Sequence, residues 1–250
     1  LGLKDDGSIV AWGSDFPGML DVPLPNTGYV AIAGGGYHSL AIRSDGSIEA
    51  WGFNDWGQCD VPAPNADFVA VAAGAYHSVG MKSDGSIAVW GNFFEGQDNG
   101  PLPNSGFVDI ALGYSHSLGL TADGSIDIWT GNSFGALDVP LPNSGFSALA
   151  AGGFHNLGLK DDSSIVTWGL NDDGQIDVPP PNVEFIAVAG GMNHSLGLKS
   201  DGSIVAWGRN DAGQTDVPPP NSGFVAVAAG NTHSLGLKAN GSIIAWGDDN

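Results

Sequence analysis

The chain repeats itself every 39 residues from one end to the other, without an insertion or a deletion. Two residue types mark the period most clearly. Histidines recur at this spacing at His38, His77, His116, His155, His194 and His233. Tryptophans do the same at Trp12, Trp51, Trp90, Trp129, Trp168, Trp207 and Trp246. A fixed period of this length is typical of solenoids and propellers, in which each unit buries its apolar faces against its neighbours.

Each copy holds four short segments of strand length and shows no helical period. In one copy these are segment A (FIAVAGG, residues 185–191), segment B (HSLGLK, 194–199), segment C (SIVAWG, 203–208) and segment D (GQTDVP, 213–218). Segments B and C are joined by Asp-Gly in most copies, and this pair favours a tight antiparallel hairpin because both residues tolerate positive φ. Four antiparallel strands per repeat predict an all-β fold, a β-propeller of four-stranded blades; an open solenoid is the less favoured alternative.

The number of blades is less constrained than their type. The sequence contains seven B–C hairpins but six copies each of segments A and D, because it starts within a segment B and stops after a segment C. We expect seven blades, with six blades and a spare hairpin as the alternative. One propeller domain is expected over residues 1–250, a length that supports a single core. Because the sequence begins at Leu1 without a methionine or a signal-peptide pattern, we expect it to be part of a longer precursor.

The repeated motifs resemble a known family. The stretches from Ala228 to Lys238 (AAGNTHSLGLK) and from Ser203 to Val217 (SIVAWGRNDAGQTDV) are similar to the repeats of the regulator-of-chromosome-condensation superfamily of β-propellers, and the resemblance covers the full chain. Members of this superfamily include a bacterial β-lactamase-inhibitory propeller. The resemblance implies seven blades and the capture of a protein on the looped face. Two positions depart from the repeat, Thr130 after the tryptophan and Asn99-Gly100-Pro101 in place of Asp-Val-Pro.

Charge and composition limit the classes of partner. Seven Lys and Arg against 27 Asp and Glu give a formal net charge of −20, which repels phosphate backbones and anionic lipids. We therefore expect no nucleic-acid binding, and no apolar run is long enough for membrane insertion. Cys59 is the single cysteine, so an internal disulfide is excluded. Few cysteines and strong acidity slightly favour an extracellular or cell-surface location, but the sequence does not fix the compartment.

The repeated histidines are predicted to be structural. Equivalent points on neighbouring packed sheets lie roughly 10 Å apart, whereas zinc needs nitrogen ligands at about 2.0 Å. Five of the six are followed by Ser and His155 is followed by Asn156, so the His-Ser pair is part of the repeat rather than a unique catalytic dyad. The acidic run from Asn171 to Asp177 lacks the ligand frame of an EF-hand loop and is predicted to be a turn. We expect no catalytic residue, no metal and no cofactor.

The copies differ most in the A–B and C–D loops, which an up-and-down blade places on one face. Consecutive copies carry eight aromatic residues there: Phe53, Trp56, Tyr76, Phe93, Phe94, Tyr114, Phe134 and Phe154. Later copies instead have polar residues in these loops: Asn171, Asp172, Asp173, Arg209, Asn210 and Asp211 in the C–D loops, and Asn231 and Thr232 in an A–B loop. Aromatic residues on loops more often mark a contact surface than buried ones do; the alternative is that they fold back onto neighbouring loops. The eight residues are therefore predicted to form one continuous binding arc.

These observations favour a non-catalytic propeller that binds a protein partner through the A–B and C–D loops. A carbohydrate-binding, lectin-like propeller is the alternative, because aromatic rings stack on sugars and Asn and Asp bond their hydroxyls. An enzyme is the least favoured hypothesis, since no unique nucleophile, carboxylate pair or phosphate loop departs from the repeat.

Overall fold

A computed structural model describes residues 1–14, 18–92, 100–129 and 134–248. Every regular element in these residues is a β-strand, and each sheet is antiparallel. The described residues divide into two units, one made of residues up to 122 and 127–129, the other of residues 123–126 and 134–248. The single domain expected over residues 1–250 stays a prediction.

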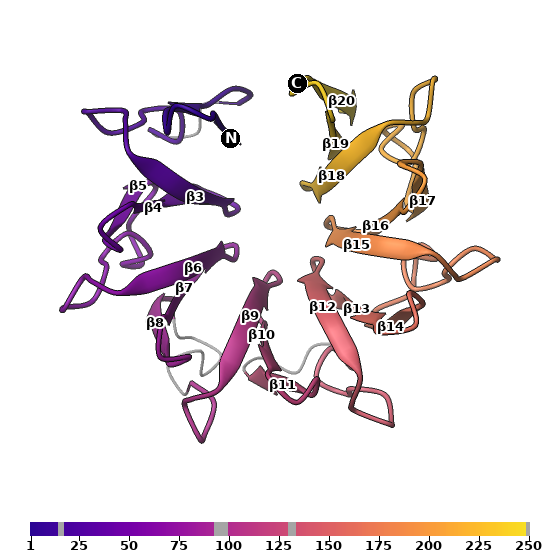
Figure 1. Cartoon of the computed structure of the whole chain (residues 1–250), viewed down its shortest axis with the longest axis horizontal. Helices are drawn as coiled ribbons and strands as arrows, with labels where there is room; N and C mark the ends of the chain where they lie inside the picture. Colours follow the sequence, from indigo (N-terminus) through magenta and orange to yellow (C-terminus); the bar gives the residue numbers. More distant parts are fainter. Residues whose placement is uncertain (15–17, 93–99, 130–133, 249–250) are drawn as a thin grey trace. The chain divides into compact units, whose positions relative to one another are not determined.

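The described strands form one two-stranded sheet and six three-stranded sheets, drawn in sequence order in Figure 1. Segment B is the central strand of every three-stranded sheet, with segments A and C on either side. The sheets comprise β1 (Gly2–Leu3) and β2 (Ile9–Val10); β3 (Tyr29–Gly34), β4 (His38–Arg43) and β5 (Ile48–Gly52); β6 (Phe68–Ala73), β7 (His77–Lys82) and β8 (Ile87–Gly91); β9 (Phe107–Leu112), β10 (Ser117–Thr121) and β11 (Ile126–Trp129); β12 (Phe146–Ala151), β13 (His155–Lys160) and β14 (Ile165–Gly169); β15 (Phe185–Gly190), β16 (His194–Lys199) and β17 (Ile204–Gly208); and β18 (Phe224–Ala229), β19 (His233–Lys238) and β20 (Ile243–Gly247).

The Asp-Gly turns join segments B and C as predicted. In the turn after β4, the Asp45 carboxylate accepts hydrogen bonds from the backbone N–H and the hydroxyl of Ser47, at 3.0 and 2.6 Å. Gly46 has a φ of +79°, and a Cβ there would lie 3.1 Å from the backbone nitrogen of Asp67. Its carbonyl accepts the N–H of Phe68 at 3.0 Å, which ties the turn to the first strand of the next sheet. Glycine therefore suits both the turn and the close approach of the next repeat, although Ser163 takes the same position with a φ of +65° in another copy.

Segment D is not a strand in the described residues, so the prediction of four-stranded blades is wrong and the blades have three strands. The outer edge of segment C is covered instead by one asparagine side chain per repeat. The Asn65 side chain accepts the N–H of Ile48 at 2.7 Å and donates to its carbonyl at 2.8 Å. This pair of bonds imitates one step of a β-ladder. Segment D itself contains prolines, which have no N–H to donate to a ladder.

Neighbouring sheets within each unit pack face to face on apolar side chains. In the first unit, Leu40, Ile42 and Ile48 of one sheet are buried against Phe68 and Trp90 of the next. In the second unit, Leu157 and Leu159 pack in the same way against Phe185 and Trp207. The repeat therefore places large side chains where two sheets meet, as a propeller blade requires.

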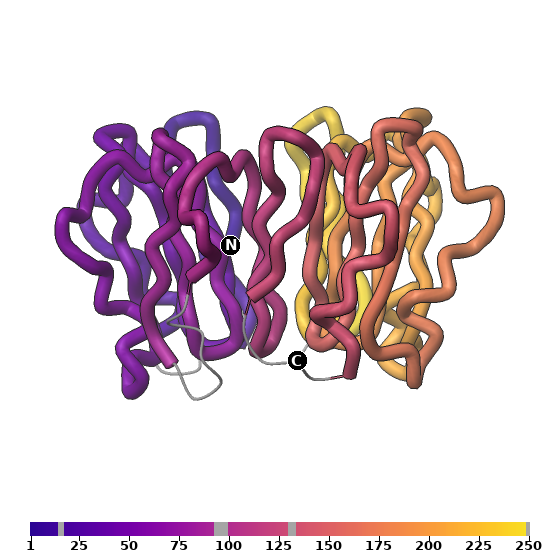
Figure 2. Tube along the Cα trace, turned by 90° about the horizontal axis from the view of Figure 1, so that it is seen from below, coloured from indigo at the N-terminus to yellow at the C-terminus, as the bar shows by residue number. Residues whose placement is uncertain are grey.

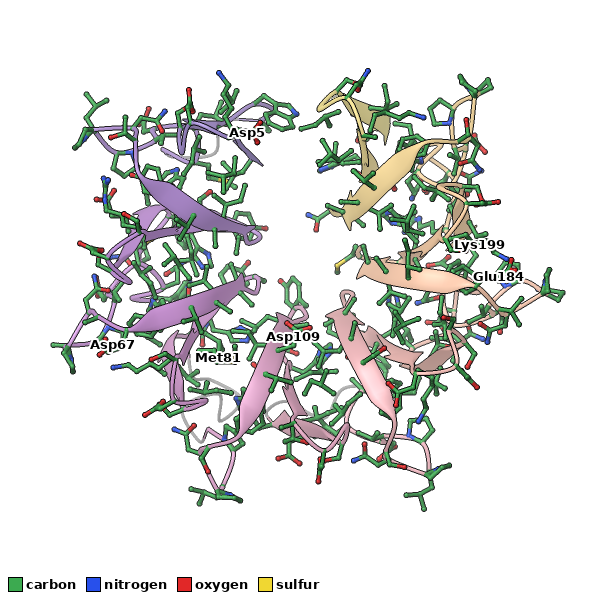
Figure 3. All side chains as sticks on the ribbon, in the orientation of Figure 1. Asp5, Asp67, Met81, Asp109, Glu184 and Lys199 are labelled. Atoms are coloured by element: carbon green, nitrogen blue, oxygen red, sulfur yellow. The ribbon has the colours of Figure 1, made fainter. Side chains whose placement is uncertain are left out.

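The lysines and the arginine that end most B strands hold the neighbouring segments in place. The Lys238 ammonium lies 3.3 Å from the ring centroid of Phe224 and donates to the carbonyls of Pro220 and Ser222. Lys199 lies 4.9 Å from the Phe185 ring in the same arrangement. Figure 3 shows Lys199 beside Glu184, at the edge where β15 begins and β16 ends. These cations act on the scaffold at the end of the sheet that carries the B–C turns.

Candidate functional site: the loop face

In the three-stranded sheets whose loops are described, the A–B and C–D loops lie at the same end, as the sequence predicts for an up-and-down blade. The carbonyl of Tyr37 in an A–B loop accepts the N–H of Phe53 in the C–D loop of that repeat at 2.9 Å. Phe154 and Leu170 make the same bond at 2.9 Å in the second unit. Within each unit the strands run between two sets of loops in Figure 2. We call the end formed by the A–B and C–D loops the loop face.

Four aromatic rings of the first unit form a contiguous row on the loop face, which we call the aromatic stack. The rings of Tyr37 and Tyr76 are stacked with centroids 5.2 Å apart. Phe53 meets Tyr37 edge-on at 6.2 Å, and Tyr114 meets Tyr76 edge-on at 5.9 Å. Hydrogen bonding between the hydroxyls raises the pKa of Tyr37, through Tyr76, and of Tyr76, through Tyr114. The stack joins the A–B loops of three successive repeats.

Three of the predicted site residues keep much of their side chain in solvent. The exposed fractions are 43% for Trp56, 37% for Tyr114 and 63% for Phe134. Trp56 and Phe134 occupy the same place in their C–D loops, directly before the glycine. Phe53, Tyr76 and Phe154 are half-buried. The predicted set therefore includes both exposed and partly packed side chains, and its role as a contact surface stays a prediction.

The second unit carries one further aromatic pair on its loop face. Phe134 and Phe154 meet edge-on with their centroids 5.4 Å apart. Phe93 and Phe94, also predicted to belong to the arc, lie outside the described residues. The continuity of all eight residues as one arc stays a prediction.

Tyr37 belongs to the aromatic stack but not to the eight predicted residues. It precedes its histidine directly, as Tyr76 and Phe154 do. Comparison of the same loop position between copies is therefore the signal that could have included it.

Five of the six repeated histidines are buried between neighbouring sheets, and His233 in the last described sheet is exposed. His38 Nε2 lies 2.7 Å from Ser78 Oγ of the next repeat, and His194 Nε2 lies 2.8 Å from Ser234 Oγ. The hydroxyl of Ser78 donates to the carbonyl of Gln58 at 2.9 Å, so its oxygen accepts the proton carried by His38 Nε2. This order assigns the Nε2–H tautomer to His38.

The same carbonyl accepts the repeated tryptophan. Trp90 Nε1 donates to the Gln58 carbonyl at 2.9 Å, and Trp246 Nε1 donates to the Gln214 carbonyl at 2.9 Å. Burial lowers the pKa of His38 to about 4 and that of His194 to about 4, so both imidazoles are neutral at pH 7. A neutral, buried imidazole that donates its N–H to a serine of the next sheet acts as a structural link between the two sheets.

The polar C–D loops of the second unit use their side chains to build turns. Asn171 accepts the N–H of Ile176 at 3.1 Å and donates to the Asp177 carboxylate at 3.0 Å. Asn210 makes the matching bonds to Thr215 and Asp216. Asn54 of the first unit binds Cys59 and Asp60 in the same way. The run from Asn171 to Asp177 is therefore a turn, as predicted.

Among the described residues, no group of three or more His, Cys, Asp or Glu side chains is placed to hold a metal ion. The described residues also include no helix long and apolar enough to cross a membrane.

The sequence profile of the regulator of chromosome condensation (RCC1) repeat matches the chain six times. The matched residues are 29–58, 68–97, 107–136, 146–175, 185–214 and 224–250, which together make up more than half of the chain. The chain belongs to this family. Membership confirms the resemblance and the propeller fold class that the 39-residue period predicts. The more particular likeness to the β-lactamase-inhibitory propeller stays a prediction.

Solved structures share the fold of this RCC1-repeat chain. The CRINKLY WD40 ectodomain of the Arabidopsis thaliana receptor kinase ACR4 is 26% identical, with a TM-score of 0.81 over 99% of this chain and 90% of that one. Prp20p from Saccharomyces cerevisiae is 23% identical, with a TM-score of 0.77 over 88% of this chain and 72% of that one. Human WBSCR16 is 16% identical, with a TM-score of 0.71 over 88% and 76%. No curated protein sequence matches the chain.

Proposed function

We propose that this chain is a non-catalytic propeller that binds a protein partner through its loop face. The observation that carries the proposal is the contrast between repeated and variable positions. The histidines, which recur in every complete copy, are used between sheets, as in the bond between His38 and Ser78. The aromatic residues that depart from the repeat, Trp56, Tyr114 and Phe134, stay exposed on the loop face. Exposed aromatic side chains are enriched among the residues that dominate binding energy at protein interfaces.

Structural relatives support a binding role at the level of the fold. Prp20p was described together with its binding to Gsp1p and histones, and yeast RCC1 (Prp20) has been crystallised in complex with Kap60. Proteins that share this fold therefore include one that binds other proteins. The absence of catalysis is part of the proposal, and it rests on the structural use of the histidines.

The test uses the immobilised chain to capture partners from an extract of its source, followed by affinity measurement with the purified partner. Trp56→Ala and Phe134→Ala should each weaken that partner by about 2 kcal/mol, since interface anchors typically cost that much on truncation. Leu24→Ala is the matched control, because Leu24 is 88% exposed but lies in the loop between segments D and A. Unchanged affinity in both aromatic variants would contradict the proposal.

The carbohydrate alternative has its own readout in the same series. A glycan array probed with the labelled chain should give no signal that depends on Trp56 or Phe134. A sugar signal that both variants abolish would replace the protein partner with a glycan, because the aromatic faces would then be stacking on sugar rings.

A further inference from the structure

The aromatic stack lies on the loop face of the first unit, and the A–B and C–D loops of this unit contain no lysine or arginine. Residues 1–131 contain three cations, Lys4, Arg43 and Lys82. Arg43 and Lys82 end β4 and β7, whereas the A–B loops precede the first residues of those strands. Because a strand rises roughly 3.3 Å per residue, the two ends of these six-residue strands lie about 16 Å apart. Lys4 takes the same position at the end of its segment B.

Negative charge occurs on the loop face itself. Asp55 is exposed in the C–D loop that also carries Phe53 and Trp56, and Asp60 is exposed in segment D, which follows this loop directly. The Asp60 carboxylate is held by the Asn54 side chain at 2.8 Å. The whole chain carries a formal charge of −20, so the long-range field also favours a cationic partner.

Tyrosine rings add a second attraction for cations. The face of an aromatic ring is electron-rich and attracts an ammonium or guanidinium group, most strongly where water is excluded. The molecule already uses this interaction elsewhere, with the Arg43 guanidinium 4.5 Å from the Tyr29 ring centroid. On the loop face the rings of Tyr37, Tyr76 and Tyr114 come from the A–B loops of three successive repeats, and the sequences of these loops contain no lysine or arginine.

We propose that the aromatic stack of Phe53, Tyr37, Tyr76 and Tyr114, together with Asp55, binds an arginine-rich segment of the partner protein. The inference rests on the proposed function and names the chemistry of its partner. Arginine fits better than lysine because guanidinium is planar, stacks on aromatic rings and is more weakly hydrated than an ammonium group. The carboxylates fix the charged groups while the rings supply the flat contact area.

The test measures fluorescence anisotropy of a fluorescein-labelled peptide of alternating arginine and glycine added to the full chain. The same peptide with lysine in place of arginine, and one with glutamate, serve as probes of chemistry. The arginine peptide should bind, the lysine peptide should bind more weakly, and the glutamate peptide should not bind. Binding should weaken with added NaCl, because exposed charges are screened.

Matched variants separate a specific site from general attraction to an acidic protein. Tyr114→Ala should weaken the arginine peptide about tenfold, which corresponds to about 1.4 kcal/mol. Met192→Ala, at the same A–B loop position of a later repeat, should leave its affinity unchanged. Asp55→Asn should weaken the peptide more than Asp172→Asn, which removes the same charge from the same C–D loop position in the second unit. Melting temperatures of all four variants establish that they are folded.

Several outcomes would overturn the inference: no binding of the arginine peptide, equal binding of the lysine peptide, or equal effects within each matched pair of variants. The proposed function fails separately. If the arginine peptide does not bind but a captured partner still depends on Trp56 and Phe134, the loop face binds protein by other chemistry. If peptide binding depends on Tyr114 but the affinity of the captured partner does not depend on Trp56 or Phe134, the site for arginine is supported. The partner must then bind another face of the chain.

Discussion

At the scale of single residues, a hydrogen-bond network between sheets explains why the histidine recurs unchanged while the loop before it varies. His155 Nε2 lies 2.9 Å from Ser195 Oγ, and the Ser195 hydroxyl donates to the Gln175 carbonyl at 2.8 Å. Trp207 Nε1 donates to the same carbonyl at 2.9 Å. The Gln175 carbonyl thus accepts hydrogen bonds from a serine and a tryptophan of the same sheet. The histidine of the preceding sheet is hydrogen-bonded to that serine, so the network joins the two sheets.

Removing the central hydroxyl should destabilise the fold. Ser195→Ala leaves the buried His155 Nε2–H without its acceptor, and an unsatisfied buried donor costs about 1 to 3 kcal/mol. Guanidinium unfolding should report this loss, whereas Ser200→Ala, at an exposed position just beyond β16, should be close to neutral. A stability equal to wild type for Ser195→Ala would show that the hydrogen bond contributes nothing.

The buried histidines also make stability depend on pH. Burial lowers the pKa of His38 and His194 to about 4, and the Nδ1 atoms of both residues have no hydrogen-bond partner, so an added proton would find no acceptor. In the unfolded chain the histidine pKa is about 6.5. The unfolded state therefore binds more protons between pH 6.5 and 4. The contribution of each histidine is complete above about pH 6.5 and is lost as the pH falls toward 4.

The expected loss is on the order of 3 kcal/mol for each strongly shifted histidine over that range. Hydrogen bonds from Ser47 and Ser203 lower the pKa of the Asp45 and Asp201 carboxyls, so these groups titrate below the histidine window. Melting temperature recorded at intervals from pH 8 to pH 4 tests the idea. A melting temperature that stays flat between pH 6.5 and pH 4.5 would mean that the histidines are not held neutral by the fold.

At the scale of the strand and its repeat, the sequence predicts segments A, B and C and their turns, because alternation, β-branched residues and Asp-Gly pairs act locally. The prediction of a strand in segment D is wrong for a physical reason. Its short run holds Val61 and Pro62, but the edge of segment C is already bonded to Asn65. The asparagine recurs after Pro-x-Pro in every repeat, but the sequence does not show that its side chain bonds the backbone of the second residue of segment C.

The role of the repeated asparagine can be tested by replacing its side-chain amide nitrogen with oxygen. Asn182 accepts the N–H of Ile165 and donates to its carbonyl, both at 2.8 Å. Asn182→Asp keeps the acceptor and replaces the donor with a carboxylate that repels the carbonyl. We expect a loss of about 1 to 3 kcal/mol in unfolding free energy. Asn231→Asp, in an exposed A–B loop, is the control, and equal effects of the two substitutions would contradict the role of Asn182.

At the scale of the whole molecule, the sequence reveals the family and the class of fold, since the period is a property of the entire chain. The candidate site was predictable in part. Exposure of Trp56, Tyr114 and Phe134 agrees with a contact surface, while Tyr76 and Phe154 pack against other rings. The contacts between rings could not be predicted, because they depend on how side chains of successive loops turn toward one another.

In the proposed function, the repeated residues hold the scaffold and the loop residues that depart from the repeat bind the partner. The most direct measurement replaces Trp56 and Tyr76 with the residues that later copies have at the same positions, Trp56→Ala as in Ala212 and Tyr76→Asn as in Asn193. Because these replacements already occur in folded repeats of this chain, the variant should melt within a few degrees of wild type. Its affinity for the captured partner should fall at least about tenfold, or about 1.4 kcal/mol. Full affinity in the folded variant would contradict the claim.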